Sequence, residues 1–495
     1  MQPDKLAVSA VSFLPVVGAD LRVPLVTGNV VRYVNLDYAA SAPCLASVWE
    51  AVARALPWYS SVHRGAGLPS AVTTAALEAA RAGVAAFLGA RLDDALIFTR
   101  NTTDALNLLA AALPEDTTVV TFASEHHANL LPWRRGRFVH LPVPASPDEA
   151  LAAAAPALAA RTTRHALLSV TGASNVTGEL WPIGPLGEVA HQHGARIAVD
   201  AAQLAPHRAI DLAALGLDYL ALSGHKLYAP FGAGVLVGRA DWLDQAAPYL
   251  AGGGAVRRVG LEDTEWVSGA ARHEAGTPNV LGALALHAAC QALAAVGMER
   301  VAAHERALLG RLIAGLDDIA GVERLSLFGP TSARVGIVAF NLHGVNHGEL
   351  ASVLSAEHGI GVRDGAFCAH PLLAALSGGA GPEAAGGPPP GAVRASLGVG
   401  TSVNDVDRLL CALSSVATRG ARWRYRRVAG RTVPDPDPRA RPVLGAAGAG
   451  EVLSSWPSEA TPDGCASLLR FPDLPAVAVP AARPAVALAA SSVGG

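Results

Sequence analysis

The chain has 495 residues, of which 51% are hydrophobic and 16% charged, and its formal net charge is -3 at pH 7. This length allows two or three domains with a large core, and the charge argues against a general nucleic-acid binder, whose basic residues would be in marked excess. Five scattered cysteines without a Cys-x-x-Cys pair indicate neither a disulfide framework nor a zinc site. We therefore expect a cytoplasmic protein whose partner is a small molecule or another protein.

The N-terminal segment contains an apolar run over 6–19. Asp4 offsets the charge of Lys5, Pro15 interrupts the run, and no small-residue cleavage pattern follows it, so we expect no signal peptide. A later uncharged segment, 280–298, is rich in alanine and glycine and suits a close-packed buried helix better than a membrane span. No transmembrane segment is predicted.

Between about 36 and 250, short apolar runs alternate with longer helical patterns rich in alanine and leucine. The runs expected to form buried strands are 95–99, 118–122, 166–170, 196–199, 219–222 and 234–237. Alternation of this kind predicts an α/β fold in which helices flank a mostly parallel sheet. Ligands of such sheets bind at the carboxyl ends of the strands, and polar residues do follow several of these ends.

A threonine-rich turn follows the first of these strands. The residues Arg100-Asn-Thr-Thr-Asp104 precede a helical pattern over 105–112. Free backbone amides, hydroxyl groups and the positive end of the helix dipole together suit a phosphate group. Considered alone, however, such a turn is more often an ordinary helix N-cap.

Asp200 and Lys226 follow two later strands. Asp200 ends an otherwise apolar strand, where a buried carboxylate needs a cationic partner such as a protonated pyridine nitrogen; a cap or structural ion pair is the alternative. Lys226 is one of only two lysines, although lysine and arginine together number 38. A neutral lysine amine can bond to an aldehyde, which arginine cannot do, whereas a surface lysine is the other reading. Phosphate turn, carboxylate and amine together predict a site for pyridoxal phosphate (PLP).

The C-terminal part predicts a smaller α+β domain, with a low-complexity insertion at 377–391 that we expect to be a mobile loop. The arginine-rich stretch 422–431 is interpreted as a solvated connector, with a docking patch for an acidic partner as the alternative. Most of the tail from 443 is expected to be disordered. The expected division is an N-terminal arm (1–35), a large domain (36–298), a small domain (299–420) and a connector with its tail (421–495).

Ten short motifs occur in the order in which a known family carries them. They are Leu36-Asp-Tyr-Ala-Ala-Ser41, Val62-His-Arg-Gly65, Asn101-Thr-Thr-Asp104, Glu125-His-His-Ala-Asn129, Ser174-Asn-Val-Thr-Gly178, Asp200-Ala-Ala-Gln203, Ser223-Gly-His-Lys226, Glu274-Ala-Gly-Thr-Pro-Asn279, Arg363-Asp-Gly-Ala-Phe-Cys-Ala369 and Val393-Arg-Ala-Ser-Leu397. With these motifs the chain resembles, from about 35 to 413, the class V, fold-type I PLP enzymes, and within them the cysteine desulfurase and selenocysteine lyase group. The resemblance implies a large PLP-binding domain, a small C-terminal domain and a homodimer.

The resemblance implies a role for each matching residue around the cofactor. Lys226 would hold PLP covalently and later move the α-proton of the substrate, while Asp200 would pair with the ring nitrogen. His126 would stack on the ring and could transfer a proton. Gln203 and Asn175 would address the phenolic oxygen. The phosphate would be held by Thr102, Thr103, Ser223 and His225, and by Thr277 of the neighbouring subunit.

A substrate-binding set follows from the same resemblance. Arg394 would clamp the α-carboxylate in a bidentate pair, and Arg363, His63 and Asn175 would complete the set. Cys368 would attack the sulfur of bound cysteine as a thiolate, which leaves a persulfide on Cys368 and alanine as the product. A small buried hydrophobe is the alternative interpretation of this cysteine.

The loop before Cys368 departs from the family pattern. Ala366 and Phe367 stand where the family commonly carries two histidines, so proton delivery and persulfide handling near Cys368 are expected to differ. We predict a cytoplasmic, homodimeric PLP enzyme that removes sulfur from L-cysteine and passes it to an acceptor protein or a biosynthetic enzyme. The alternatives are a C–S lyase, aminotransferase or epimerase of specialised metabolism, and a catalytically silent binding protein. No metal, nucleic-acid or membrane partner is expected.

Overall fold

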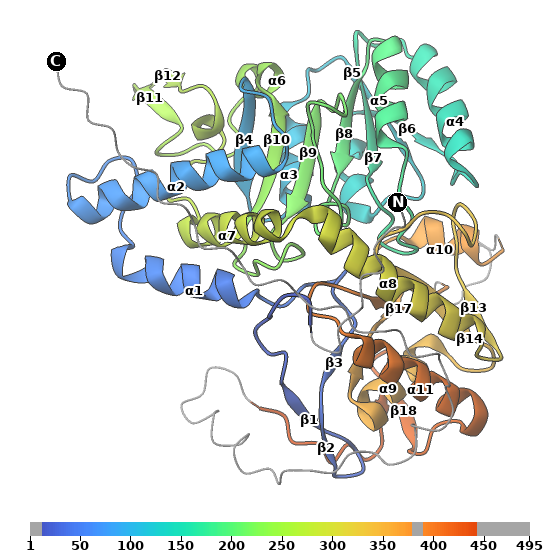
Figure 1. Ribbon diagram of the computed structural model, residues 1–495. Helices are drawn as coiled ribbons and strands as arrows, with labels where there is room; N and C mark the ends of the chain where they lie inside the picture. Colours follow the sequence, from blue (N-terminus) through green and yellow to red (C-terminus); the bar gives the residue numbers. More distant parts are fainter. Residues whose placement is uncertain (1–11, 379–389, 443–495) are drawn as a thin grey trace, which may run out of the picture.

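The computed structural model describes residues 12–378 and 390–442. The centre of the low-complexity insertion and the whole tail from 443 lie outside the described residues, so the loop and the disorder expected there stay predictions. Within the described part, a larger body built on one sheet lies above a smaller α+β body in the view of Figure 1. The cavity discussed below lies where the two bodies meet.

The larger body contains a seven-stranded sheet with the order β4-β10-β9-β8-β7-β5-β6. Its strands are β4 (Asp94–Thr99), β5 (Thr117–Phe122), β6 (Arg137–Leu141), β7 (His165–Thr171), β8 (Arg196–Asp200), β9 (Tyr219–Ser223) and β10 (Gly234–Arg239). All neighbours are parallel except that β10 runs antiparallel to both β4 and β9. The mostly parallel sheet expected from the sequence is thus confirmed, with β6 as an additional edge strand.

Helices cover both faces of this sheet, as Figure 1 shows. Successive strand residues point to opposite faces, so Val120 and Val199 enter one core while Val119 and Ala198 enter another. The first core is completed by α2 (Leu68–Phe87), α4 (Pro147–Ala159), α5 (Ile183–Gln192) and α7 (Val280–Val296), and the second by α3 (Thr102–Ala112) and α6 (Ala240–Gln245). The apolar strand runs are therefore buried on both sides, as in other α/β sheets.

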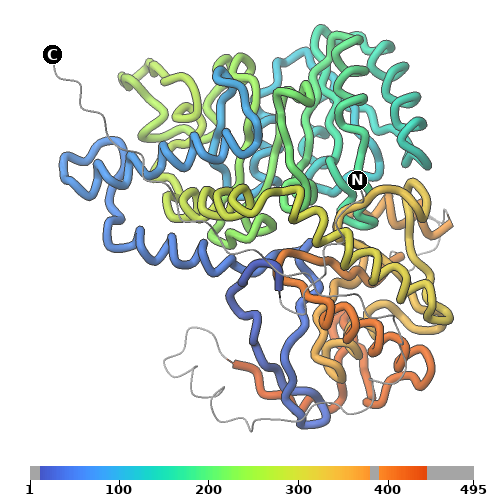
Figure 2. Tube along the Cα trace, viewed as in Figure 1, coloured from blue at the N-terminus to red at the C-terminus, as the bar shows by residue number. Residues whose placement is uncertain are grey.

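The smaller body packs three helices on an antiparallel sheet with the order β13-β14-β17-β16. Its elements are α8 (Met298–Asp317), α9 (His347–His358), α11 (Val403–Arg419), β13 (Val322–Arg324), β14 (Ile337–Leu342), β16 (Arg363–Gly365) and β17 (Ala392–Ser396). The N-terminal strand β3 (Val34–Asn35) pairs in parallel with β15 (Ile360–Gly361). The blue N-terminal trace therefore runs beside the orange and red C-terminal trace in Figure 2.

Shorter elements complete the described chain. Two hairpin pairs are β1 (Arg22–Pro24) with β2 (Val30–Arg32) and β11 (Val256–Val259) with β12 (Thr264–Trp266). The remaining helices are α1 (Ala46–Ala55), α10 (His370–Leu376) and the 3-10 turns η1 (Leu56–Trp58), η2 (His127–Asn129), η3 (Pro132–Arg135) and η4 (Ala270–Arg272).

The arginine-rich stretch after 420 forms a hairpin, β18 (Tyr425–Val428) and β19 (Arg431–Pro434), which the sequence pattern did not predict. The carboxylate of Glu357, at the end of α9, fastens this hairpin to the smaller body. It accepts hydrogen bonds from the backbone N–H groups of Arg422 and Trp423 and from the Tyr425 hydroxyl at 2.9 Å. Hydrogen bonds to a charged acceptor are among the stronger ones in proteins, so the stretch is held to the fold.

Among the described residues, no single helix has both the length and the hydropathy of a membrane span. Helices α7 and α8 meet these criteria only when they are taken together, across an 80° bend.

Candidate active site

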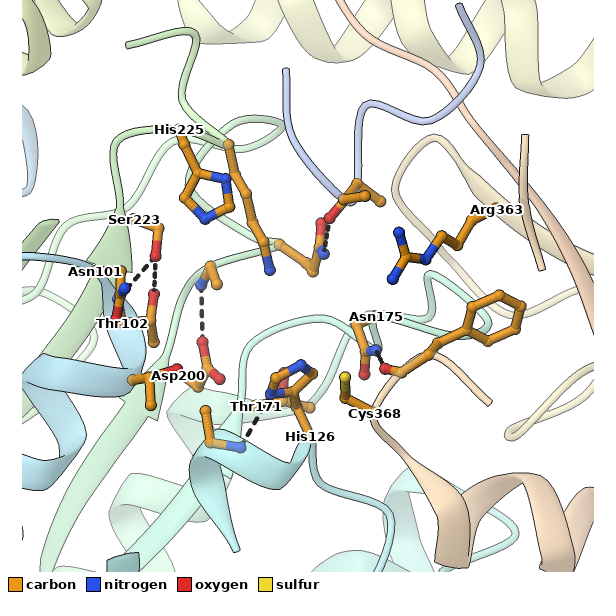
Figure 3. Close-up of a pocket in the computed structure, with 18 of the residues that line it drawn as sticks. Asn101, Thr102, His126, Thr171, Asn175, Asp200, Ser223, His225, Arg363 and Cys368 are labelled. Atoms are coloured by element: carbon orange, nitrogen blue, oxygen red, sulfur yellow. Dashed lines mark hydrogen bonds between the residues drawn. The ribbon is translucent and has the colours of Figure 1, made fainter. Parts of the chain in front are cut away.

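Polar residues from the strand ends converge on one cavity of about 280 Å³. Figure 3 shows this cavity with most of the residues that line it. The carboxyl edge of the large sheet supplies one side, and β16, β17 and the loop before α10 supply the other. The predicted site residues that line it are Thr102, Thr103, His126, Asn175, Asp200, Gln203, Ser223, His225, Lys226, Arg363, Cys368 and Arg394.

One end of the cavity is formed by the start of α3. The Asn101 side chain caps the helix by accepting the backbone N–H of Asp104 at 3.0 Å. The Thr102 N–H and hydroxyl both lie within hydrogen-bond distance of Ser223 Oγ, at 2.7 and 2.8 Å. In Figure 3, Asn101, Thr102 and Ser223 lie together on this side. A helix N-terminus surrounded by hydroxyl groups is suited to a phosphate.

Lys226 lies on the loop that joins β9 to β10. Because these strands are antiparallel neighbours, the loop leaves and re-enters the same edge of the sheet, and the Gly224 N–H donates to the Ala233 carbonyl at 2.7 Å. A Cβ on Gly224 would come within 2.7 Å of that same carbonyl oxygen. The tight closure therefore requires glycine and fixes the direction from which Lys226 enters the cavity.

The ionisation of Lys226 and Asp200 is set mainly by burial. Burial lowers the pKa of the Lys226 amine; the charge of Asp200 opposes this shift and that of Arg394 adds to it. Burial also raises the pKa of Asp200, which is 5% exposed, while Lys226 and the Ala202 N–H favour its charged form. A lysine amine with a lowered pKa is more easily neutral and hence a better nucleophile.

His126 follows β5 and contributes a neutral ring. Its Nδ1 accepts the backbone N–H of Ala128 at 3.0 Å, so the neutral imidazole carries its proton on Nε2. Burial, followed by the charges of Lys226 and His127, lowers the pKa of His126 to about 3. The ring is therefore neutral at neutral pH, and it can stack on a flat ligand without carrying a charge.

Arg394 lies on β17 and is only 3% exposed. One guanidinium nitrogen donates to the Asn175 carbonyl at 2.7 Å and another to Asp37 Oδ1 at 3.3 Å. Burial lowers the pKa of Arg394 to about 10, although Asp37 opposes the shift. Asp37 belongs to the first motif noted in the sequence. Its ion pair with Arg394 was not predicted, because the spacing of residues along the chain does not show contacts between residues so far apart.

Cys368 lies on the loop between β16 and α10, on the side of the cavity that Figure 3 shows near Arg363 and away from Ser223. Phe367 and Cys368 have φ angles of 51° and 55°, in the left-handed region that non-glycine residues seldom adopt. The Asn175 amide donates to the Phe367 carbonyl at 2.7 Å, and the His127 N–H donates to the Cys368 carbonyl at 2.8 Å. These bonds hold the exposed thiol against the larger body.

Two predicted site residues do not line this cavity. The His63 Nε2 lies 3.1 Å from the Glu78 carboxylate on α2, and Thr277 lines a second cavity together with Phe98 and Tyr249. The substrate-binding role of His63 therefore stays a prediction. So does the contact of Thr277 with a phosphate, since that contact requires a second subunit.

The cavity residues fit a phosphorylated pyridine aldehyde. The helix start and hydroxyl groups at one end suit its phosphate, Asp200 suits a protonated ring nitrogen, and the Lys226 amine suits the aldehyde. Within the described chain, Gln203 Oε1 and Arg394 Nε are buried without a hydrogen-bond partner. Buried polar atoms are rarely left unpaired, and a ligand with both donor and anionic groups would satisfy the two.

Comparison with known proteins shows relatives of this chain in sequence and in fold. A sequence model described as Aminotransferase class-V matches residues 34–409. A cysteine desulfurase of Klebsiella pneumoniae is 37% identical over 404 residues, 79% of this chain and 94% of that protein. One of Dickeya dadantii is 37% identical over 371 residues, 72% of this chain and 85% of that protein.

Solved structures show the same likeness. The apo cysteine desulfurase of Thermococcus onnurineus has a TM-score of 0.70 at 31% identity, over 78% of this chain and 95% of that one. A cysteine desulfurase of Escherichia coli, in an S-sulfonic acid form, has a TM-score of 0.68 at 33% identity with the same coverage of both chains. The expected fold-type I architecture is therefore confirmed.

Proposed function

Because the chain belongs to the class V aminotransferase family, we propose that it is a PLP-dependent cysteine desulfurase, which converts L-cysteine to L-alanine through a persulfide on Cys368. The observation that carries the proposal is the presence of Cys368, Lys226 and Arg394 around a single cavity. These residues offer a nucleophile for sulfur, an amine for proton transfer and a clamp for a carboxylate. The names of the relatives support the same activity.

When bound, PLP supplies an electron sink that stabilises negative charge at the Cα atom of an amino acid. The chain itself holds and orients the reactants. Lys226 would be the attachment point, Asp200 would keep the ring nitrogen protonated, and His126 would cover a ring face. Gln203 and Asn175 would address the phenolic oxygen. The phosphate-binding set is Thr102, Thr103, Ser223 and His225.

The chemistry of the substrate depends on three side chains of the cavity, Arg394, Lys226 and Cys368. Arg394 binds the α-carboxylate, and the Lys226 Nζ removes the α-proton and returns a proton to the product. The Cys368 Sγ–S bond forms while the Cβ–S bond of the substrate breaks. The electron pair of the broken bond stays with the carbon skeleton, and a proton added there gives alanine. Transfer of the persulfide sulfur to an acceptor then restores the thiol.

We further propose that the enzyme is a cytoplasmic homodimer that passes sulfur to an acceptor. A homodimer would bring Thr277 of one subunit to the phosphate held by the other. The sulfur acceptor is a protein or a biosynthetic enzyme, and the scattered cysteines favour the cytoplasm. Selenocysteine, whose selenium is held by a similar bond, is a second substrate to assay.

A C–S lyase or aminotransferase is the second candidate function, and the loop beside Cys368 favours it. Ala366 and Phe367 offer no proton donor where the related loop commonly has two histidines. In that case the Cβ–S bond of the substrate would break with its electron pair on sulfur, which leaves as sulfide, and the carbon skeleton would be released as an enamine that hydrolyses to pyruvate and ammonia. The two functions therefore differ in their products.

The deciding assay quantifies alanine, sulfide and pyruvate from L-cysteine under reducing conditions, using the PLP-loaded enzyme and its Cys368→Ala variant. We expect alanine and sulfide in equal amounts from the unaltered enzyme. The variant should lose alanine formation by at least about a hundredfold, since the persulfide cannot form, yet retain PLP. Pyruvate from the unaltered enzyme, or full alanine formation by Cys368→Ala, would contradict the desulfurase mechanism.

A further inference from the structure

The guanidinium of Arg394 is buried but only partly hydrogen-bonded. Its two side-chain hydrogen bonds go to the Asn175 carbonyl and to Asp37. Its Nε, although buried, has no partner among the described residues. A guanidinium has five N–H donors in one plane, so the free donors at its edge are available for a carboxylate.

The Phe367 ring packs against this same guanidinium. The Arg394 Cζ atom lies 5.0 Å from the centre of the Phe367 ring, within the range of a cation–π contact. Phe367 is 7% exposed, so the ring also excludes water from the side of the guanidinium that it covers. The free N–H donors of Arg394 can then form a bidentate pair with a carboxylate away from the ring.

The backbone of Phe367 is fixed by the residue that also fixes Arg394. The Asn175 side chain donates to the Phe367 carbonyl at 2.7 Å, and the Asn175 carbonyl accepts from Arg394 at 2.7 Å. Asn175, Phe367 and Arg394 thus form a closed set of three contacts, and Figure 3 shows the bond from the Asn175 side-chain amide as a dashed line. The position of the ring is consequently set by the loop and by the wall of the cavity together.

We propose that Phe367 is a positioning residue that holds the Arg394 guanidinium edge-on to the α-carboxylate of the amino-acid substrate. The inference rests on the proposed function for the identity of the substrate, but it requires only that the ligand be an α-amino acid. In this proposal the ring takes no part in bond breaking. Its loss should therefore weaken carboxylate binding and leave the binding of the amino group intact.

Equilibrium binding separates these two effects. The PLP-loaded enzyme is titrated with L-alanine and with ethylamine, which is alanine without its carboxylate, while the cofactor absorbance is followed. In Phe367→Leu, which keeps apolar bulk but loses the aromatic face, we expect the Kd for L-alanine to rise about tenfold. The Kd for ethylamine should stay within about twofold of its original value. Phe367→Tyr keeps the aromatic face and should bind both ligands as the unaltered enzyme does.

A matched control tests whether the loss of a cation–π contact elsewhere in the protein would also weaken the binding of L-alanine. Arg300 lies 5.8 Å above the Phe13 ring, outside the cavity, and Phe13→Leu should change neither Kd. Equal weakening of L-alanine and ethylamine in Phe367→Leu, or unchanged L-alanine binding, would overturn the proposal. Thermal unfolding of each variant identifies any that fails to fold; if Phe367→Leu does, Phe367→Met, which also keeps apolar bulk without an aromatic face, takes its place with the same expected results.

Failure of this inference can be told apart from failure of the proposed function. Neither ligand contains sulfur, so the titrations do not depend on desulfuration. If the unaltered enzyme forms pyruvate, the desulfurase proposal fails while the difference between L-alanine and ethylamine still reports on Phe367. With L-cysteine as substrate, the same variant should raise KM about tenfold and change kcat by less than about threefold.

Discussion

At the scale of single residues, burial decides the charge states in the cavity. His126 has a pKa lowered to about 3, first by burial and then by Lys226, His127 and Arg394. The unfolded chain would protonate this histidine near its ordinary pKa of about 6.5. Because the folded-state pKa is the lower one, the stability contributed by a neutral His126 is complete above pH 6.5 and is lost as the pH falls from 6.5 towards 3.

We therefore expect the stability of His126→Asn to depend less steeply on pH than that of the unaltered protein. Asparagine can accept the Ala128 N–H but does not titrate. Urea unfolding of the PLP-free proteins between pH 7 and pH 4.5 should show the stability difference changing by up to about 1.4 kcal/mol per pH unit. The exposed His343 serves as the control through His343→Asn. Parallel curves for His126→Asn and the unaltered protein would contradict the expected charge state.

The sequence predicted most cavity residues because they follow strand ends or stand in recognised motifs. Asp200 and Lys226 are of this kind. The Asp37–Arg394 pair and the ring of Phe367 over Arg394 were not predicted, because each joins residues distant in the sequence and depends on how the two bodies meet. Spacing along one chain carries no information on such contacts.

At the scale of elements, the strands of the large sheet that the sequence predicted are more buried than β6 and the hairpin β18–β19, which it did not predict. The six predicted strands of the large sheet are mostly buried, whereas β6 exposes three of its five residues at the edge of the sheet. The hairpin β18–β19 is mostly exposed as well. An apolar run signals a buried strand, and neither β6 nor this hairpin has one.

Glu357 gives the hairpin an anchor that can be tested. In Glu357→Gln the side chain loses its charge and replaces one acceptor oxygen by a donor, facing the N–H groups of Arg422 and Trp423. We expect the hairpin to open more readily by about 1–3 kcal/mol, seen as faster hydrogen exchange over 425–434. Glu188→Gln, at an exposed position on α5 of the larger body, should leave exchange unchanged. Equal exchange in Glu357→Gln would show that other contacts hold the hairpin.

At the scale of the whole molecule, the expected dimer can be tested by complementation. Lys226→Ala removes the attachment point, and Thr277→Glu places a negative charge where we expect the phosphate of the neighbouring subunit. Each variant alone should be inactive. Mixed dimers should recover up to half of the activity per dimer, because one of their two sites lacks both changes. No recovery in mixtures with proven subunit exchange would contradict a shared site.

The loop that carries Lys226 also bears on the order in which the site matures. Both ends of this loop are held by neighbouring strands of one sheet, whereas Arg394 and Cys368 belong to segments that are synthesised much later. Contacts between residues close in sequence form before those that close long loops. During synthesis, the loop that carries Lys226 can therefore fold before the segments that carry Arg394 and Cys368 exist. The substrate-binding part of the site forms only after the C-terminal strands have been synthesised.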